Sequence, residues 1–115
     1  MVGQTVKTTD DEIFERQAQI CKAFAHPGRL RILDLLGQGE RGVSELQKEL
    51  NFSKTSLSQQ ISILKAAGVL STRRKGKQIY CSLAIPEVKH ACQLIRGVLR
   101  AQIAASYRLH PPLEE

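Results

Sequence analysis

The sequence is poor in the residues that build disulfide-rich, membrane-spanning and single-strand-binding proteins. Its 115 residues include three cysteines, no tryptophan and only five Phe or Tyr residues. Three cysteines, none in a C-x-x-C pair, cannot make a disulfide framework, so we expect reduced thiols. No run reaches the roughly 18 apolar residues of a membrane span, and residues 1–11 lack the features of a secretory signal. These absences predict a soluble cytoplasmic protein with no membrane partner.

Charge, unlike aromatic content, is abundant and unevenly placed. The chain has 17 Lys or Arg against 11 Asp or Glu, and residues 29–80 alone hold 10 basic and 4 acidic side chains. A local basic excess favours an anionic partner, whereas scarce aromatics argue against stacking on a single nucleic-acid strand. Double-stranded DNA is therefore the expected partner. No phosphate-binding glycine loop, nucleophile elbow or carboxylate pair is visible, so we expect no enzyme.

Glycine and proline divide the chain into one domain with five helices and a hairpin. Apolar residues recur at helical spacing over 10–25, and Pro27 opens a second helix that Gly37 ends. After Pro86, a last helix carries two apolar stripes. So much apolar surface on the first and last helices predicts a partner subunit. The expected parts are a flexible arm, the domain and a loose tail, at residues 1–9, 10–106 and 107–115.

A short helix, a turn and a longer helix are predicted in the middle of the chain. The short helix covers 43–50 and carries Ser44 and Gln47 at the spacing of a capping box. Ser53 is a good N-cap for the longer helix, which we expect to run over 54–67. Its buried side is marked by three apolar residues, Leu57, Ile61 and Leu64. The opposite side is polar throughout.

Two strands, over 69–74 and 78–83, enclose a basic loop at Gly76. A basic hairpin after a helix-turn-helix indicates a mainly α winged helix-turn-helix with a two-stranded wing. Its longer helix fits the major groove. We expect base-edge contacts from six residues, Lys54, Thr55, Ser56, Ser58, Gln59 and Gln60. We expect phosphate or minor-groove contacts from four wing residues, Arg73, Arg74, Lys75 and Lys77.

In order and spacing, four segments resemble the ArsR/SmtB family of bacterial repressors from about Ile13 to Leu99. They are KAFAHPGRLRILDLL (22–36), VSEL (43–46), SKTSLSQQISILKAAGVL (53–70) and RRKGKQIYCSL (73–83). The resemblance implies a homodimer that pairs through its first and last helices and binds an inverted repeat in operator DNA. It also implies a repressor that releases DNA when an inducer binds. A winged-helix module that binds proteins and senses no inducer is the alternative, and the basic wing argues against it.

The inducer sites of that family match this sequence poorly. Residues 43–48 contain no cysteine where arsenic sensors carry a pair, and the second helix lacks the thiol of persulfide sensors. The last helix offers Glu87 and His90 but no second histidine of the kind that zinc sensors use there. Only a nonstandard cysteine site remains open to this chain.

Two of the three cysteines stand on the helices expected to meet in the dimer. Cys21 and Cys92 are therefore candidates for binding or reacting with an inducer such as As(III), another thiophilic metal ion, an oxidant or a persulfide. Cys81 is a third candidate thiol, but it alternates with apolar strand residues, which favours a packing role for it over sensing. A free cysteine on an apolar stripe also serves as a small hydrophobe, and the sequence leaves both interpretations open.

Overall fold

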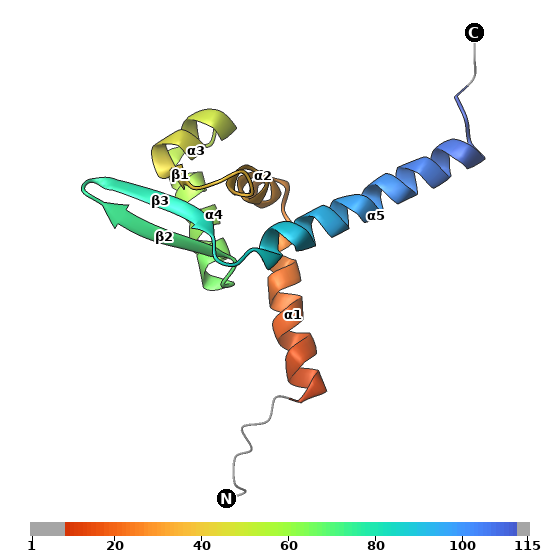
Figure 1. Cartoon of the computed structure of the whole chain (residues 1–115), viewed down its shortest axis with the longest axis horizontal. Helices are drawn as coiled ribbons and strands as arrows, with labels where there is room; N and C mark the ends of the chain where they lie inside the picture. The colour runs from red at the N-terminus through yellow and green to blue at the C-terminus, as the bar shows by residue number, and fades with distance from the viewer. Residues whose placement is uncertain (1–8, 113–115) are drawn as a thin grey trace, which may run out of the picture.

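The computed structural model describes residues 9–112, which form five helices and one three-stranded antiparallel sheet (Figure 1). The helices are α1 (Asp10–Phe24), α2 (Pro27–Leu36), α3 (Val43–Leu50), α4 (Lys54–Ala66) and α5 (Glu87–Leu109). The strands are β1 (Arg41–Gly42), β2 (Leu70–Lys75) and β3 (Gln78–Leu83), and β3 lies between the other two. The predicted mainly α winged helix-turn-helix is confirmed.

The short strand β1 makes the sheet larger than the predicted two-stranded wing. Arg41 pairs with Cys81 and Gly42 pairs with Tyr80, so β1 adds an edge strand at the base of the hairpin. Two residues are too few to show the alternation by which strands are found in a sequence, and glycine is depleted in strands. The prediction of only two strands was wrong for this reason.

The beginnings of the helices test the predicted caps. Ser53 caps α4 as predicted, because its Oγ accepts a hydrogen bond from the Ser56 amide at 3.0 Å. The capping box predicted for α3 is wrong. The N-cap there is Gly42, whose amide donates to Oε1 of Glu45 at 3.2 Å. Since α3 is already helical at Val43, Ser44 falls inside the first turn and cannot act as its cap.

At the other end of the chain, α5 continues three residues past the predicted boundary at 106. Tyr107 and Leu109 are helical, and His110 is the C-cap that follows the last helical residue. Pro111 follows, and the residue before a proline is disfavoured in helical conformation. Residues 1–8 of the predicted arm and 113–115 of the predicted tail lie outside the described residues.

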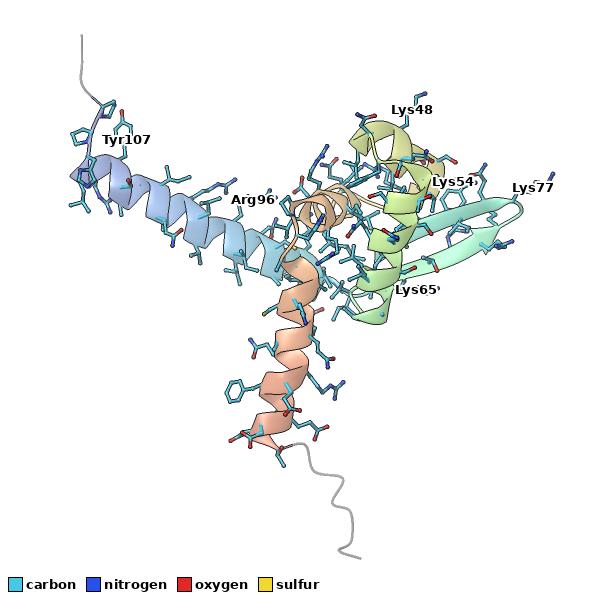
Figure 2. The ribbon with its side chains drawn as sticks, turned by 180° about the vertical axis from the view of Figure 1, so that it is seen from behind. Lys48, Lys54, Lys65, Lys77, Arg96 and Tyr107 are labelled. Carbon is cyan, nitrogen blue, oxygen red and sulfur yellow. The ribbon has the colours of Figure 1, made fainter. Side chains whose placement is uncertain are left out.

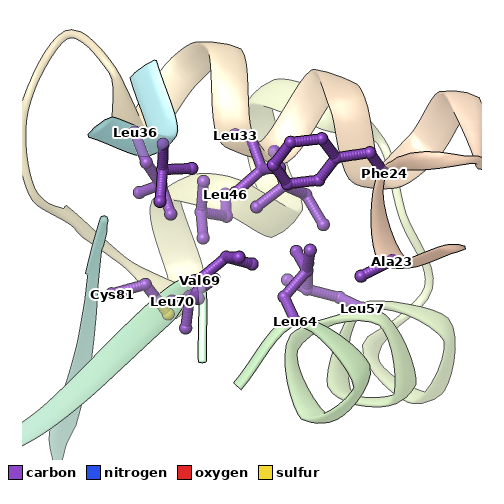
Figure 3. Close-up of a cluster of buried hydrophobic side chains, with 12 residues drawn as sticks. Ala23, Phe24, Leu33, Leu36, Leu46, Leu57, Leu64, Val69, Leu70 and Cys81 are labelled. Atoms are coloured by element: carbon purple, nitrogen blue, oxygen red, sulfur yellow. The ribbon is translucent and has the colours of Figure 1, made fainter. Parts of the chain in front are cut away.

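A single apolar core joins α2, α3, α4 and the sheet (Figure 3). Six of its side chains are almost completely buried, namely Ile32, Leu33, Leu46, Leu57, Leu64 and Cys81. Burial of each large aliphatic side chain stabilises the fold by about 1.5–3 kcal/mol. Leu57 and Leu64 are buried and Ile61 is half-buried, as predicted for α4. The core therefore holds α4 with its polar side turned away from the protein.

By contrast, α1 and α5 extend from this core in different directions (Figure 1). Their buried residues lie only where they join it, at Ala23, Phe24 and Val88. Along their free lengths they expose large apolar side chains, including Ile13, Phe14, Leu94, Val98, Leu99, Ile103 and Leu109. No helix within residues 9–112 has the length and apolar character needed to cross a membrane. An uncovered apolar surface of this size marks an interaction site.

Candidate nucleic-acid interface

The outer side of α4 is an exposed row of polar side chains. It consists of Lys54, Thr55, Ser58, Gln59, Ser62 and Lys65. The helix begins at Lys54, so its first turn also presents free backbone N–H groups and the positive end of the helix dipole. A helix with hydroxyls, an amide and two lysines on one side has the donors and acceptors needed to contact base edges in a major groove.

Two residues predicted to contact bases lie on a different side of α4. Gln60 is half-buried, and its Oε1 accepts from Nη1 of Arg29 at 2.9 Å. Arg29 also donates to the backbone oxygens of Ala23 and Lys22 at 2.6 and 3.1 Å. Ser56, four residues before Gln60 and therefore on the same side, is half-buried too. Gln60 thus ties α4 to α1 and α2, a long-range contact that no local pattern reveals.

On the wing, alternation turns the side chain of Arg74 toward α4. Arg74 and Thr72 share the face of β2 that pairs with Ile79 and the buried Cys81. Nζ of Lys65 on α4 donates to Oγ1 of Thr72 at 2.8 Å, which shows that this face meets α4. The exposed Lys75 and Lys77 flank Gly76 at the tip of the hairpin.

Arg73 lies on the opposite face of the wing, where its guanidinium is already engaged. Its Nε and Nη2 donate to the two carboxylate oxygens of Glu40 at 2.8 and 2.7 Å. Its central carbon lies 4.8 Å from the centroid of the Tyr80 ring. The hydrogen bond from Arg73 lowers the pKa of Glu40, and the same bond raises the pKa of Arg73. Nothing in the sequence links these residues, which are 33 positions apart.

The helix α3 adds polar groups for which the sequence predicted no role in DNA binding. Ser44 and Lys48 are exposed, and Gln47 borders a groove of about 320 Å³ between α3, α4 and the wing. Figure 2 shows that the labelled lysines of α3, α4 and the wing tip lie on one side of the molecule, away from the free end of α5. Ser44 and Lys48 are four residues apart, and this spacing could have predicted that they share one polar side of α3. The candidate interface is thus continuous over three elements.

The chain is similar to known proteins over most of its length. The profile of the family described as bacterial regulatory protein, arsR family, matches residues 26–72. The uncharacterized HTH-type transcriptional regulator Rv0081 of Mycobacterium tuberculosis is 36% identical over 90 residues, which cover 77% of this chain and 79% of that protein. The chain belongs to the arsR family of bacterial regulatory proteins. Membership makes it a transcriptional regulator and not an enzyme.

Solved structures of related proteins share the fold. The crystal structure of Rv0081 has a TM-score of 0.76 at 34% identity and covers 81% of this chain and 94% of that chain. The solution structure of the homodimeric winged helix-turn-helix DNA-binding domain of Mb0332 from Mycobacterium bovis has a TM-score of 0.71 at 30% identity. It covers 100% of this chain and 99% of that chain.

A relative known from its sequence is described as a repressor. The biofilm growth-associated repressor of Agrobacterium fabrum is 45% identical over 67 residues, which cover 58% of this chain and 57% of that protein.

The three thiols of this arsR-family chain have different surroundings. All are free: Cys21 is exposed, Cys92 is half-buried and Cys81 is buried. Burial raises the pKa of Cys81 to about 11 and also raises the pKa of Cys92. Because the thiolate is the reactive form, Cys81 is inert near neutral pH. Cys81 therefore has the properties of a core residue.

Cys92 also borders a small pocket between α2 and α5. The pocket has a volume of about 120 Å³, and Asp34 and Arg96 line it together with Cys92. Nη1 of Arg96 donates to Oδ1 of Asp34 at 3.1 Å and so connects the two helices beside the thiol. Among residues 9–112, no group of three or more His, Cys, Asp or Glu side chains is arranged to hold a metal ion. A three-ligand metal site would therefore need groups from outside this set.

Proposed function

We propose that this arsR-family regulator is a homodimeric repressor that binds an inverted repeat in operator DNA in the cytoplasm. In each protomer α4 enters the major groove, and Arg74, Lys75 and Lys77 contact neighbouring phosphates. The observation that carries the proposal is the division of the surface. Polar and basic groups of α3, α4 and the wing gather on one side, and the uncovered apolar faces belong to α1 and α5. A relative described as a homodimeric DNA-binding domain supports the same arrangement.

Gln59 is the test of base reading, because it is exposed on the outer side of α4. We expect the parent protein to select an inverted repeat from a random pool of DNA duplexes, with half-sites about one helical turn apart. Gln59→Ala should relax the preference at one or two base pairs of each half-site, since a good bidentate contact discriminates by about 1–3 kcal/mol. The measurement is sequencing of the selected pools.

The matched control is Gln60→Ala on the same helix. It removes the hydrogen bond to Arg29 and should leave the base preference of the parent unchanged. Identical preferences in the parent and Gln59→Ala would remove Gln59 from base reading. A parent protein that enriches no sequence would contradict the proposed function and favour the protein-interaction alternative.

We further propose that a thiol-reactive inducer acts through Cys21 and Cys92. Cys21 is exposed and Cys92 is half-buried, and both lie on helices whose apolar faces are uncovered in the single chain. As(III) or another thiophilic metal ion would need ligands from outside the described residues of one protomer, such as thiols of the second protomer, whereas an oxidant or a persulfide requires only the thiols. Coupling between a sensing site and DNA is typically 1–3 kcal/mol, or about 5–150-fold in affinity.

Replacement of each cysteine by serine separates sensing from packing. We expect arsenite, a persulfide donor or zinc to release DNA from the parent and from Cys81→Ser, because Cys81 is buried and protonated. Release should be lost or reduced in Cys21→Ser and Cys92→Ser. Fluorescence anisotropy of a labelled selected duplex measures it. If none of the three reagents releases DNA from the parent, or if both variants respond as the parent does, the thiols do not sense these inducers.

A further inference from the structure

Glu40, Tyr80 and Arg73 form a clamp across the outer face of the sheet. We propose that Glu40 and Arg73 are positioning residues that hold the wing for DNA binding, and that Arg73 itself does not contact DNA. The inference rests on the proposed DNA-binding function. It concerns one of the four wing cations that the sequence assigns to phosphate contact.

The register of the sheet brings the three residues together. The central strand β3 places Tyr80 beside Gly42 of β1 on one side and beside Arg73 of β2 on the other. Glu40 stands just before β1, so the side chain of Arg73 has to pass over the Tyr80 ring to reach it. The clamp therefore joins the two edge strands across the middle strand of the sheet.

The chemistry of the contact favours a fixed geometry. Two parallel N–H donors meet the two oxygens of one carboxylate, which is the bidentate arrangement that guanidinium forms best. The aromatic face beneath adds a cation–π contact. The pair uses two of the five N–H donors of Arg73, so a phosphate contact by the remaining donors would place the Glu40 carboxylate beside the DNA backbone, where the two negative groups repel each other.

The clamp also connects the wing to the helix-turn-helix. Gly42, two residues after Glu40, is the N-cap of α3, and its amide is held by Glu45. Arg74, the next residue along β2, lies on the other face, toward α4. Holding Arg73 against the outer face therefore restrains the strand on which Arg74 points toward α4. Loss of the clamp is expected to loosen the wing relative to α3 and α4.

Two interpretations of Arg73 predict opposite signs for Glu40→Gln. If Arg73 contacts phosphate, Glu40 competes with DNA, and neutralising Glu40 strengthens binding. If the pair positions the wing, neutralising Glu40 weakens binding in the same direction as removal of Arg73. The sign therefore separates a phosphate contact from a positioning role.

The experiment measures affinity against salt concentration for a duplex that the parent selects from a random pool. Glu40→Gln, Arg73→Ala and Arg73→Lys should each lower affinity about three- to tenfold, since Lys keeps the charge but loses the bidentate fork. The double variant Glu40→Gln with Arg73→Ala should lose no more than either single variant. The slope of log K against log salt should stay at the parent value. Glu49→Gln, on an exposed residue of α3, is the control for loss of one carboxylate.

A second measurement does not depend on DNA. In the free protein, the Nε–H of Arg73 should give a nuclear magnetic resonance signal that exchanges slowly with solvent, and Glu40→Gln should abolish that protection. Urea unfolding of each variant shows whether it is folded. If Glu40→Gln strengthens binding while Arg73→Ala lowers the salt slope by about one unit per protomer, Arg73 contacts phosphate and the proposal is wrong. If the parent binds no duplex, the proposed function fails, and an unprotected Nε–H in the parent would independently overturn the clamp.

Discussion

Leu99→Glu is expected to convert the dimer into monomers and to lower DNA affinity at least about 100-fold. Leu99 is 52% exposed in the single chain and lies on an apolar stripe of α5 with Ile95 and Ile103. Burying such a side chain contributes about 1.5–3 kcal/mol, whereas burying an unpaired carboxylate costs several kcal/mol. Two-fold symmetry applies the change twice in each dimer. Sedimentation equilibrium measures the association, and anisotropy of the selected duplex measures DNA binding.

Ala104→Glu supplies the matched control. At 3.6 residues per turn, Ala104 lies on the opposite side of α5 with Arg100, and both are exposed. It adds the same charge to the same helix and should leave the protein dimeric. A dimeric Leu99→Glu protein, or equal dissociation of both variants, would show that this stripe does not form the interface.

Arg74→Ala combined with Lys77→Ala is expected to produce the second large effect. Both side chains are exposed, and Arg74 is on the face of the wing that meets α4. In a dimer the double variant removes up to four phosphate contacts, each worth about 0.9 in the slope of log K against log salt. Affinity should therefore fall up to roughly a thousandfold near 0.15 M salt, for every DNA sequence alike. Binding titrations over a range of salt concentrations provide the slope.

Lys89→Ala combined with Arg100→Ala removes the same charge from α5, outside the wing. Both residues are exposed, so the change tests the effect of net charge alone. The slope should stay within about one unit of the parent value. If this control lowers the slope as much as the wing variant does, the wing makes no special contribution to phosphate binding.

The sequence predicted the features that neighbouring residues determine, and it missed those that depend on residues far apart in the chain. The limits of α4 followed from local signals, because Ser53 and the spacing of Leu57 and Leu64 lie within one segment. The core and the polar side of α4 followed from the same periodicity. The strand β1 could not be predicted, because its two residues become a strand only by pairing with β3.

Within the candidate interface, the same difference separates the side chains. Lys54, Ser58 and Gln59 are exposed as predicted, since helical spacing alone determines which side of α4 they occupy. Gln60 and Arg73 instead have partners 31 and 33 positions away. Sequence patterns describe which residues can face outward but not which of those have found a partner elsewhere in the fold.

The helix α5 is attached to the core near one end and is free along the rest of its length. Of its 23 residues Val88 alone is buried, so the helix is held near one end, beside the Asp34–Arg96 pair and Cys92. At 1.5 Å per residue it reaches about 34 Å, and a rotation of about 5° at the joint would move its far end by about 3 Å. Because the far end carries much of the apolar surface, we expect a small rotation at this joint to change the distance between the two α4 helices of the proposed dimer.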